Sequence, residues 1–211
     1  MIIIFRGTKI QVSNETTLQA AKRLLDDGEK VLALNFANGV SPGGGFLHGA
    51  RAQEECLCRS SALYLTLSGD PMYGHHAARS LPDSTDWAIL SPDVPVFRAD
   101  YGTMLNEPYL LSFITCAAPY APTVGKRESA ILVKSRIHRI LEIAHAYGYS
   151  DLVLGAWGCG AFDNDPVETA RSFKDHLTGD FSGAFSQIVF AITDWSTDRK
   201  MLGPFRNIFM Q

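Results

Sequence analysis

The chain has 211 residues, of which 46% are hydrophobic and 19% are charged, and its formal net charge is -3. This length suits one domain, and the composition excludes a disordered, collagenous or low-complexity protein. Eighteen glycines and ten prolines make up about 13% of the chain, close to the usual share. The pI near 6.0 argues against an electrostatic grip on duplex nucleic acid. Backbone N–H groups can still hold a small anion.

The lengths of the apolar stretches and the number of cysteines indicate the cellular compartment that we expect for the protein. The longest mainly apolar stretch, Tyr109 to Ala118, is about half of the roughly 20 residues that a membrane-spanning helix needs. The apolar N-terminus has no basic region before it, so it is not a signal peptide. We therefore expect a cytoplasmic protein that does not bind a membrane. Four cysteines in a chain of this length are not a disulfide framework, and Cys56 and Cys58 belong to no recognised zinc pattern. We expect no metal site.

Strand-like and helix-like segments alternate along the chain. Apolar runs of four to eight residues indicate buried strands, and apolar residues at helical spacing indicate amphipathic helices. Together they predict an α/β layer sandwich with a largely buried sheet. The expected strands are Met1–Phe5, Lys9–Val12, Val31–Phe36, Trp87–Leu90, Leu110–Ala117, Asp151–Leu154 and Ile188–Ile192. The expected helices are Leu18–Gly28, Ala50–Leu67, Arg127–Tyr147, Pro166–Leu177 and Thr197–Phe209.

Residues 68–109 are the least regular region. Prolines prevent long helices and central strands. A connection of this length inside a compact domain favours a functional loop. The prolines of this region are Pro71, Pro82, Pro92, Pro95 and Pro108.

Two glycine-rich loops are the strongest functional signal. The first, Asn35–Gly45, leaves an apolar strand and leads to a helix that carries Gln53-Glu54-Glu55, and the second is Gly155–Phe162. In open α/β sheets, ligands bind beyond the carboxyl ends of the strands. Neither loop matches the dinucleotide fingerprint or the Walker pattern. Two such loops nevertheless favour a phosphate-bearing ligand.

Glu54 and Glu55 are adjacent acids on a helix that is otherwise apolar around them. Neighbouring residues on a helix point about 100° apart, so we expect the two carboxylates to have different tasks. Desolvation raises the pKa of a carboxyl group, which suits a general acid. These residues favour a hydrolase that acts on a phosphorylated sugar.

Several separated motifs resemble the poly(ADP-ribose) glycohydrolases, most closely the compact bacterial type. Gly43-Gly44-Gly45 is followed after seven residues by Gln53-Glu54-Glu55, as in the signature of that family. The upstream Asn35–Asn38 and the downstream Trp157–Phe162 are similar as well, and so is Ser91–Arg98 in the central region.

The resemblance implies a macrodomain-like fold, a three-layer α/β/α sandwich with a mixed central sheet. We expect residues 1–211 to form one catalytic domain, with a short N-terminal accessory segment over about residues 1–30. The implied activity is cleavage of ribose–ribose O-glycosidic bonds of poly(ADP-ribose), with no cofactor and no metal. The expected partners are ADP-ribose, poly(ADP-ribose) and ADP-ribosylated macromolecules, and we expect a monomer. The shortened accessory segment puts the affinity for the adenine end of the substrate in question.

The resemblance also assigns roles to residues. Glu55 would be the general acid that protonates the leaving 2′-oxygen and then activates water, while Glu54 would hold the adjoining ribose hydroxyls. Gln53 would support the two acids. The other implied substrate contacts are Asn38, Gly43, Gly44 and Gly45 at the distal ribose, Gly158, Cys159, Gly160 and Ala161 around the diphosphate, Phe162 at the terminal ribose, and Phe97 at the adenine.

Two alternatives remain open. A related hydrolase would remove a single ADP-ribose from a protein side chain or a nucleic-acid base with the same pocket. A non-catalytic ADP-ribose reader would need no acid, so the intact Gln53-Glu54-Glu55 argues against it. After the second loop, we expect Asn164 or Asp165 to cap the helix that begins at Pro166.

Four other residues receive structural interpretations. Cys159 has no histidine near it in the sequence, so we interpret it as a small residue that fits its loop and not as a nucleophile. We expect His75 and His76 to face solvent or to be satisfied core residues. Trp195, after the last strand, either flanks the pocket or packs against the last helix, and we favour packing.

Overall fold

A six-stranded sheet forms the centre of the computed structural model, which describes residues 7–210. The expected strand at Met1–Phe5 therefore lies outside the described residues. The sheet order is β1-β6-β5-β2-β4-β3, and neighbouring strands are parallel except for the antiparallel pair β3 and β4. The expected mixed sheet is confirmed. The strands are β1 Lys9–Ser13, β2 Val31–Ala37, β3 Ala88–Arg98, β4 Met104–Ala117, β5 Asp151–Leu154 and β6 Gln187–Ala191.

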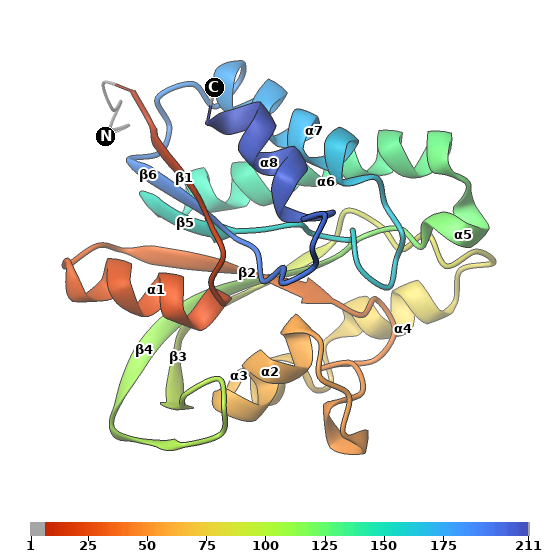
Figure 1. Cartoon of the computed structure of the whole chain (residues 1–211). Coiled ribbons are helices and arrows are strands. Elements are labelled where there is room, and N and C mark those ends of the chain that lie inside the picture. The colour runs from red at the N-terminus through yellow and green to blue at the C-terminus, as the bar shows by residue number, and fades with distance from the viewer. Residues whose placement is uncertain (1–6, 211) are drawn as a thin grey trace.

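Helices cover both faces of this sheet (Figure 1). The first four α-helices lie on one face and the last three on the other, which completes the three layers of an α/β/α sandwich. In the part of the chain that the structure describes, no helix is both long enough and apolar enough to span a membrane. The helices are α1 Thr17–Asp26, the 3-10 helix η1 Phe46–His48, α2 Gln53–Ser60, α3 Leu63–Leu67, α4 Pro71–Ala77, α5 Ala121–Val124, α6 Lys126–Ala146, α7 Pro166–Thr178 and α8 Leu202–Phe209.

The central strands are buried on both faces, as expected from their continuous apolar runs. In β2, Leu32 and Leu34 join the apolar cluster beneath α6, α7 and α8, while Val31 and Ala33 join the cluster beneath α1 to α4. This alternation fixes the register of β2, because a slip of one residue would exchange its two faces.

The expected helix over residues 50–67 is interrupted. It forms as two helices, α2 and α3, because the backbone between them hydrogen-bonds to strand β3 instead of continuing the helix. Ser61 makes an isolated antiparallel bridge with Val96, and the N–H of Ala62 donates to the Pro95 carbonyl at 3.0 Å. Helical periodicity continues across this break, so the sequence pattern alone does not reveal it.

The expected functional loop over residues 68–109 is wrong. The region contains α4, β3 and the first part of β4. Strand β3 lies at the edge of the sheet, where Pro92 and Pro95 remove no ladder hydrogen bond, and the register shifts between Ser91 and Val94. Pro71 opens α4 behind Asp70, whose side chain accepts from the Met72 N–H at 2.8 Å.

The last helix also begins later than expected, at Leu202 instead of Thr197. Asp194 holds the preceding turn, because its Oδ1 accepts from the Ser196 N–H at 3.0 Å and its Oδ2 from the Met201 N–H at 2.9 Å. Outside these regions and the longer β4, the expected helices and strands are confirmed to within about two residues at each end.

Candidate active site

The two glycine-rich loops begin side by side at one edge of the sheet. Strand β2 runs into residues 38–52 and β5 into residues 155–165. Because β2 and β5 are neighbouring parallel strands, their carboxyl ends lie at the same edge. This is the edge at which open α/β sheets bind ligands.

Gln53 fastens the start of α2 to the end of β2. Its Oε1 accepts from the Phe36 N–H at 2.9 Å, and its Nε2 donates to the Leu34 carbonyl at 2.8 Å and to the Thr17 hydroxyl at 3.0 Å. The amide is thus occupied by protein groups of two elements. Gln53 therefore positions the acids that follow it.

Glu54 points into the protein and is only 3% exposed. Its Oε2 accepts from the Asn38 N–H at 2.7 Å, and its Oε1 accepts from the Asn35 amide at 3.3 Å. Burial raises the pKa of Glu54 from 4.5 to about 7, against the lowering effect of these hydrogen bonds, and the charge of Glu55 raises it further. A substantial fraction of Glu54 is therefore protonated near neutral pH.

One carboxyl oxygen of Glu55 accepts a hydrogen bond, and the other has no hydrogen-bond partner among the described residues. Glu55 lies in the first turn of α2 and is 8% exposed. Its Oε1 accepts from the Gly45 N–H at 3.0 Å, whereas its Oε2 is buried and makes no hydrogen bond within residues 7–210. A buried polar atom without a partner is costly and often marks a site of reaction. This oxygen is available to give or take a proton.

The triple glycine lets the first loop lie directly against both acids. Gly44 has φ of +58°, and a Cβ there would come within 2.3 Å of Glu55 Oε1 and 3.1 Å of Glu54 Oε2. Any larger residue would displace the carboxylates. Gly43 has φ of +69° and also leaves too little room for a side chain, because a Cβ would lie 2.9 Å from the Phe46 ring.

Asn38 shapes the turn that precedes these glycines. Its Oδ1 accepts from the N–H groups of Val40 and Ser41, both at 2.9 Å, and its own N–H donates to Glu54. Asn38 is half-buried and adjoins the acids, as the resemblance implies. The side-chain oxygen is already used by the loop, so the amide NH₂ is the group left for a ligand.

Asn164 holds the second loop, a role that the sequence did not reveal. Its Nδ2 donates to the carbonyls of Pro119 and Gly158 at 2.9 and 3.0 Å, and its Oδ1 accepts from the Ser129 hydroxyl. Asp165 is the residue that caps α7, because it accepts from the Val167 N–H at 2.8 Å. Of the two caps considered, Asp165 is correct.

In the second loop, Gly158 is packed against neighbouring residues, whereas Gly160 is exposed. Gly158 has φ of +75°, and a Cβ there would lie 2.6 Å from the Ala118 methyl. A Cβ on Gly160 would meet no described atom within 4 Å, and Ala161 is exposed. Residues 160 and 161 therefore offer backbone to a ligand. Phe162 is half-buried, with its ring edge-on to Tyr120 at 5.9 Å.

Cys159 is buried, and burial raises the pKa of its thiol to about 12. A thiol with such a pKa is not a nucleophile at neutral pH, which agrees with its interpretation as a packing residue.

His76 is also buried, and its ring nitrogens contact the Gly39 carbonyl and the Thr85 hydroxyl at 3.0 and 2.7 Å. It is a satisfied core residue.

Phe97 is not brought to this edge, contrary to the adenine contact that the resemblance implies. Strand β3 is antiparallel to β4, so Ala88 pairs with Cys116 at the carboxyl edge while Val96 pairs with Tyr109 far along the hairpin. Phe97 therefore lies beside the end of α2, where the neighbouring Arg98 donates to the Arg59 carbonyl at 3.0 Å.

Trp195 does not pack against the last helix, so that expectation is wrong. Its side chain is 75% exposed in the loop after β6, and the Arg199 guanidinium lies 5.7 Å from its ring centre. Because β6 neighbours β5, this loop belongs to the same carboxyl edge. The exposed ring therefore belongs to a loop at the same edge of the sheet as the two glycine-rich loops. Only the sheet order places it there.

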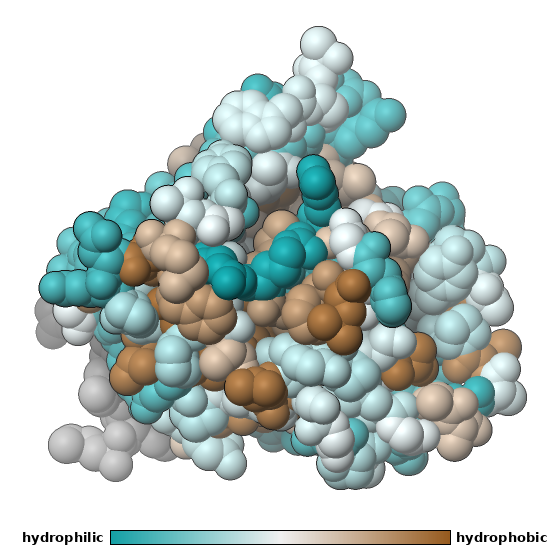
Figure 2. All heavy atoms as spheres, turned by 90° about the horizontal axis from the view of Figure 1, so that it is seen from below, coloured by the Kyte–Doolittle hydropathy of each residue, from teal (hydrophilic) through white to brown (hydrophobic). Residues whose placement is uncertain are grey.

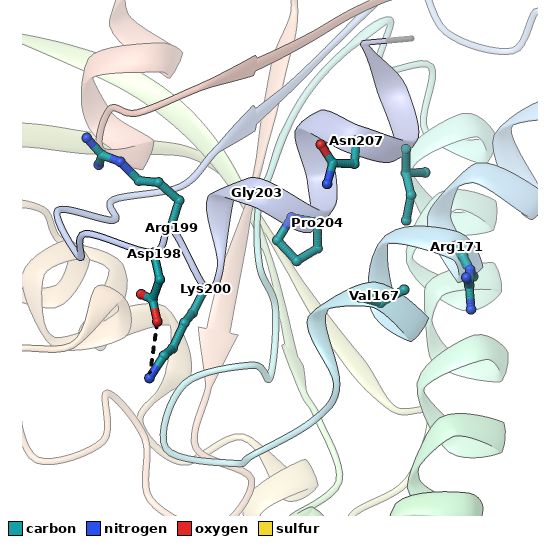
Figure 3. Close-up of a pocket in the computed structure, with 9 residues that line it drawn as sticks. Val167, Arg171, Asp198, Arg199, Lys200, Gly203, Pro204 and Asn207 are labelled. Carbon is teal, nitrogen blue, oxygen red and sulfur yellow. Dashed lines mark ion pairs between the residues drawn. The ribbon is translucent and has the colours of Figure 1, made fainter.

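A hollow of about 460 Å³ lies between α7, α8 and the loop that joins β6 to α8 (Figure 3). Lys200 and Asp198 form an ion pair of 3.5 Å at its rim, and Arg171 and Arg199 make it basic. None of the predicted site residues lines it. The hollow is therefore distinct from the pair of acids and the two glycine loops.

Comparisons with known proteins show the family to which the chain belongs. The family model described as "Microbial-type PARG, catalytic domain" matches residues 5–99. The crystal structure of poly(ADP-ribose) glycohydrolase (PARG) from Thermomonospora curvata is 42% identical with a TM-score of 0.94, and the match covers 98% of this chain and 78% of that one. The chain belongs to the microbial-type PARG family.

Two further PARG structures contain ligands. The Thermomonospora curvata enzyme bound to the inhibitor ADP-HPD is 44% identical, with a TM-score of 0.93 and coverage of 96% of this chain and 80% of that chain. The Deinococcus radiodurans enzyme in complex with ADP-ribose is 39% identical, with a TM-score of 0.91 and coverage of 98% and 85%. The search of curated proteins gave no match. The PARG resemblance of the sequence motifs is thus confirmed at the level of the family and the fold.

The buried acid Glu54 should make the stability of this PARG-family protein depend on pH. Its pKa in the folded protein lies above its value in the unfolded chain, so the folded state binds more protons between about pH 4.5 and about pH 7. The free energy of unfolding should fall as the pH rises through this window, by about 3 kcal/mol from this group. Urea denaturation of the wild type and Glu54→Gln at several pH values measures the effect. A constant difference between the two proteins would contradict the raised pKa.

Asn164→Ala should loosen the second loop. The substitution leaves the Gly158 and Pro119 carbonyls and the Ser129 hydroxyl without this partner, so we expect a loss of about 2–4 kcal/mol of stability. ADP-ribose affinity should fall about tenfold in calorimetry. Asn207→Ala, an exposed site on α8, is the matched control and should change neither quantity. Unaltered stability of Asn164→Ala would refute its positioning role.

Proposed function

We propose that the protein hydrolyses ribose–ribose O-glycosidic bonds of poly(ADP-ribose) and releases ADP-ribose, with Glu55 as the general acid/base. The observation that carries this proposal is the carboxyl of Glu55, buried with Oε1 held by Gly45 and Oε2 unpartnered among the described residues. It stands at the edge where both glycine loops begin. Membership of the PARG family and the ADP-ribose complex of a relative support the same substrate class.

A single carboxyl can serve both halves of the reaction. Glu55 in its acid form donates its proton to the 2′-oxygen while the bond from that oxygen to the anomeric carbon breaks. The resulting Glu55 carboxylate takes a proton from water, whose oxygen bonds to the anomeric carbon, and the acid form is restored. Most glycosidases divide these steps between two carboxyl groups. Here Glu54 is held by Asn35 and Asn38, so one residue performs both steps.

Glu54 has a binding task in this mechanism. Each of its oxygens already accepts one hydrogen bond from the protein and retains a second lone pair. Those lone pairs can accept from the ribose hydroxyls, as the resemblance implies. Its raised pKa reduces the negative charge beside an anionic substrate. Gln53 supports both acids through its bonds to β2 and α1.

Backbone groups would hold the diphosphate. The second loop leaves residues 160 and 161 open to a ligand, and Asn164 fixes the conformation of the loop around Gly158. N–H groups of such a loop bind anions without a lysine cluster. This explains how a chain of net charge -3 can bind an anionic substrate. Cys159 and Phe162 would contribute their backbone and ring to the same end of the ligand.

The proposed unit is the single sheet with its two helical layers. Strand β1 and helix α1, which lie in the short N-terminal segment over about residues 1–30, pack into these layers. On the face seen from below in Figure 1, hydrophobic and hydrophilic residues are interspersed (Figure 2). This face does not call for a second copy of the chain, and we propose a monomer.

A substrate comparison tests the function. The wild-type protein is incubated in parallel with poly(ADP-ribose) and with a protein that carries single ADP-ribose units, and released ADP-ribose is quantified. We expect release from the polymer. Release only from the singly modified protein would favour the mono-ADP-ribosyl hydrolase. ADP-ribose binding in calorimetry without turnover of either substrate would favour a reader.

A further inference from the structure

A cluster of metal-ligating side chains lies away from the two glycine loops. It consists of His138 on α6, His176 in the last turn of α7, and Asp180 just after α7. One ligand atom from each lies within 4.8 Å of the other two. His138 Nδ1 is 3.6 Å from Asp180 Oδ2, and the two imidazole centres are 5.3 Å apart.

The position of the cluster separates it from the candidate active site. Helix α7 begins after the second glycine loop at the carboxyl edge and runs back towards the start of β6. Its last turn therefore lies at the opposite edge of the sheet. Helices α6 and α7 run next to each other over one face (Figure 1). The cluster bridges these two helices.

The hydrogen bonding of His176 leaves one of its ring nitrogens available to bind a cation. Its Nε2 lies 3.0 Å from the Lys134 carbonyl, and a hydrogen bond there leaves Nδ1 as the nitrogen with a free lone pair. Histidines that bind metals commonly donate their other ring N–H to a carbonyl in this way.

The surroundings of the cluster suit a bound cation as well. The ring of Phe181 packs edge-on against His138 and His176, at centre distances of 5.2 and 6.4 Å, and so restricts both imidazoles. The carbonyl end of α7 carries partial negative charge. The nearby positive charge of Lys134 is paired with Asp175 at 2.9 Å.

We propose that His138, His176 and Asp180 bind a divalent transition metal ion of the zinc class. Two imidazole nitrogens and one carboxylate oxygen are a donor set that Zn²⁺ accepts, with water as the fourth ligand. The side chains of His138 and Asp180 are 43% and 72% exposed, so an ion can enter from solvent. The metal fastens α6 to α7 and stabilises the layer that covers this face of the sheet.

Metal binding and stability can be measured without any enzymatic assay. Zn²⁺ is titrated into the metal-free protein in a calorimeter, and Co²⁺ is added to a second sample to record its visible absorption. We expect one equivalent of Zn²⁺ to bind, and the melting temperature to rise with Zn²⁺ concentration because the unfolded chain lacks the assembled site. Tetrahedral Co²⁺ should absorb in the visible range.

Variants identify the ligands. His138→Gln and His176→Gln should abolish stoichiometric binding, and Asp180→Asn, at a position that is 72% exposed, should weaken it at least about tenfold. His145→Gln is the matched control, since His145 lies two turns further along α6 outside the cluster. It should bind Zn²⁺ like the wild type.

Two results would overturn the proposal. One is the absence of Zn²⁺ binding by the wild type at about 100 µM metal. The other is binding that survives in His138→Gln and Asp180→Asn but is lost in Cys56→Ser, which would assign the ion to the half-buried thiol. Hydrolysis of poly(ADP-ribose) does not depend on this site, so the outcome leaves the proposed function untouched.

Discussion

Replacement of Glu55 by glutamine should lower the rate of ADP-ribose release from poly(ADP-ribose) by about 10³-fold or more. The amide keeps the size of the side chain, and its oxygen can still accept from the Gly45 N–H. It cannot donate and then recover a proton. The affinity for ADP-ribose should therefore stay within about threefold of the wild type, because binding by the loops does not need the proton.

Single-turnover kinetics on polymer and calorimetry with ADP-ribose measure the two quantities separately. Glu142→Gln is the control, since Glu142 is exposed on α6 and its one ion pair within residues 7–210 is with Arg139. Turnover by Glu55→Gln within about tenfold of the wild type would show that another group transfers the proton. A loss of ADP-ribose affinity as large as the loss of rate would instead make Glu55 a binding residue.

Gly44→Ala should abolish most activity through the acids that the loop touches. The added methyl would stand 2.3 Å from Glu55 Oε1, so the carboxyl must move away from its bond with Gly45. A displacement of about 1 Å can cost about 10²-fold in rate. The backbone at φ of +58° adds about 1–2 kcal/mol of strain.

Gly49→Ala is the control that distinguishes the effect of the steric clash with Glu55 from the effect of backbone strain at a positive φ. Gly49 lies in the same loop with φ of +85°, but a Cβ there would meet no described atom within 4 Å. In urea denaturation we expect both variants to lose stability through backbone strain, with a further loss in Gly44→Ala from the displaced carboxyl, whereas only Gly44→Ala should lose activity. Equal activity of the two variants would show that the contact between Gly44 and Glu55 is not needed for catalysis.

Local patterns predicted most elements of the fold because hydrophobic periodicity and capping residues act over a few neighbouring residues. Pro166 and the preceding Asp165 marked the start of α7 correctly. The same reasoning failed where distant backbone intervenes. Ser61 leaves the helix because Val96 pairs with it, and Pro95 is tolerated in a strand because that strand is an edge. Neither partner is visible from the local sequence.

The candidate site likewise combines features that the local sequence predicts with features that depend on contacts between distant residues. Its acids and glycines were recognisable because their types and spacing are unusual, but their tasks depend on contacts. The hydrogen bonds of Asn35 and Asn38 turn Glu54 inward, and the absence of a described partner for Glu55 Oε2 leaves that oxygen free. The family resemblance put Phe97 at the adenine, and packing against the last helix was the favoured interpretation of Trp195. Strand direction and sheet order place neither residue there.

The metal-ligating cluster is the clearest case of a feature hidden from the sequence. His138 and His176 stand 38 residues apart on different helices, so no short spacing connects them. Their approach depends on how α6 and α7 pack on the sheet.

The α/β class, the two glycine-rich loops and the pair of acids can be recognised from composition and local spacing alone. The hydrogen bonds of the two acids, and the aromatic residues that reach the carboxyl edge, depend on how the chain folds. Hydrogen bonds and desolvation arise from groups that the fold brings together across the sheet. Glu54 and Glu55 are identical in type and adjacent in sequence, and only their contacts distinguish them.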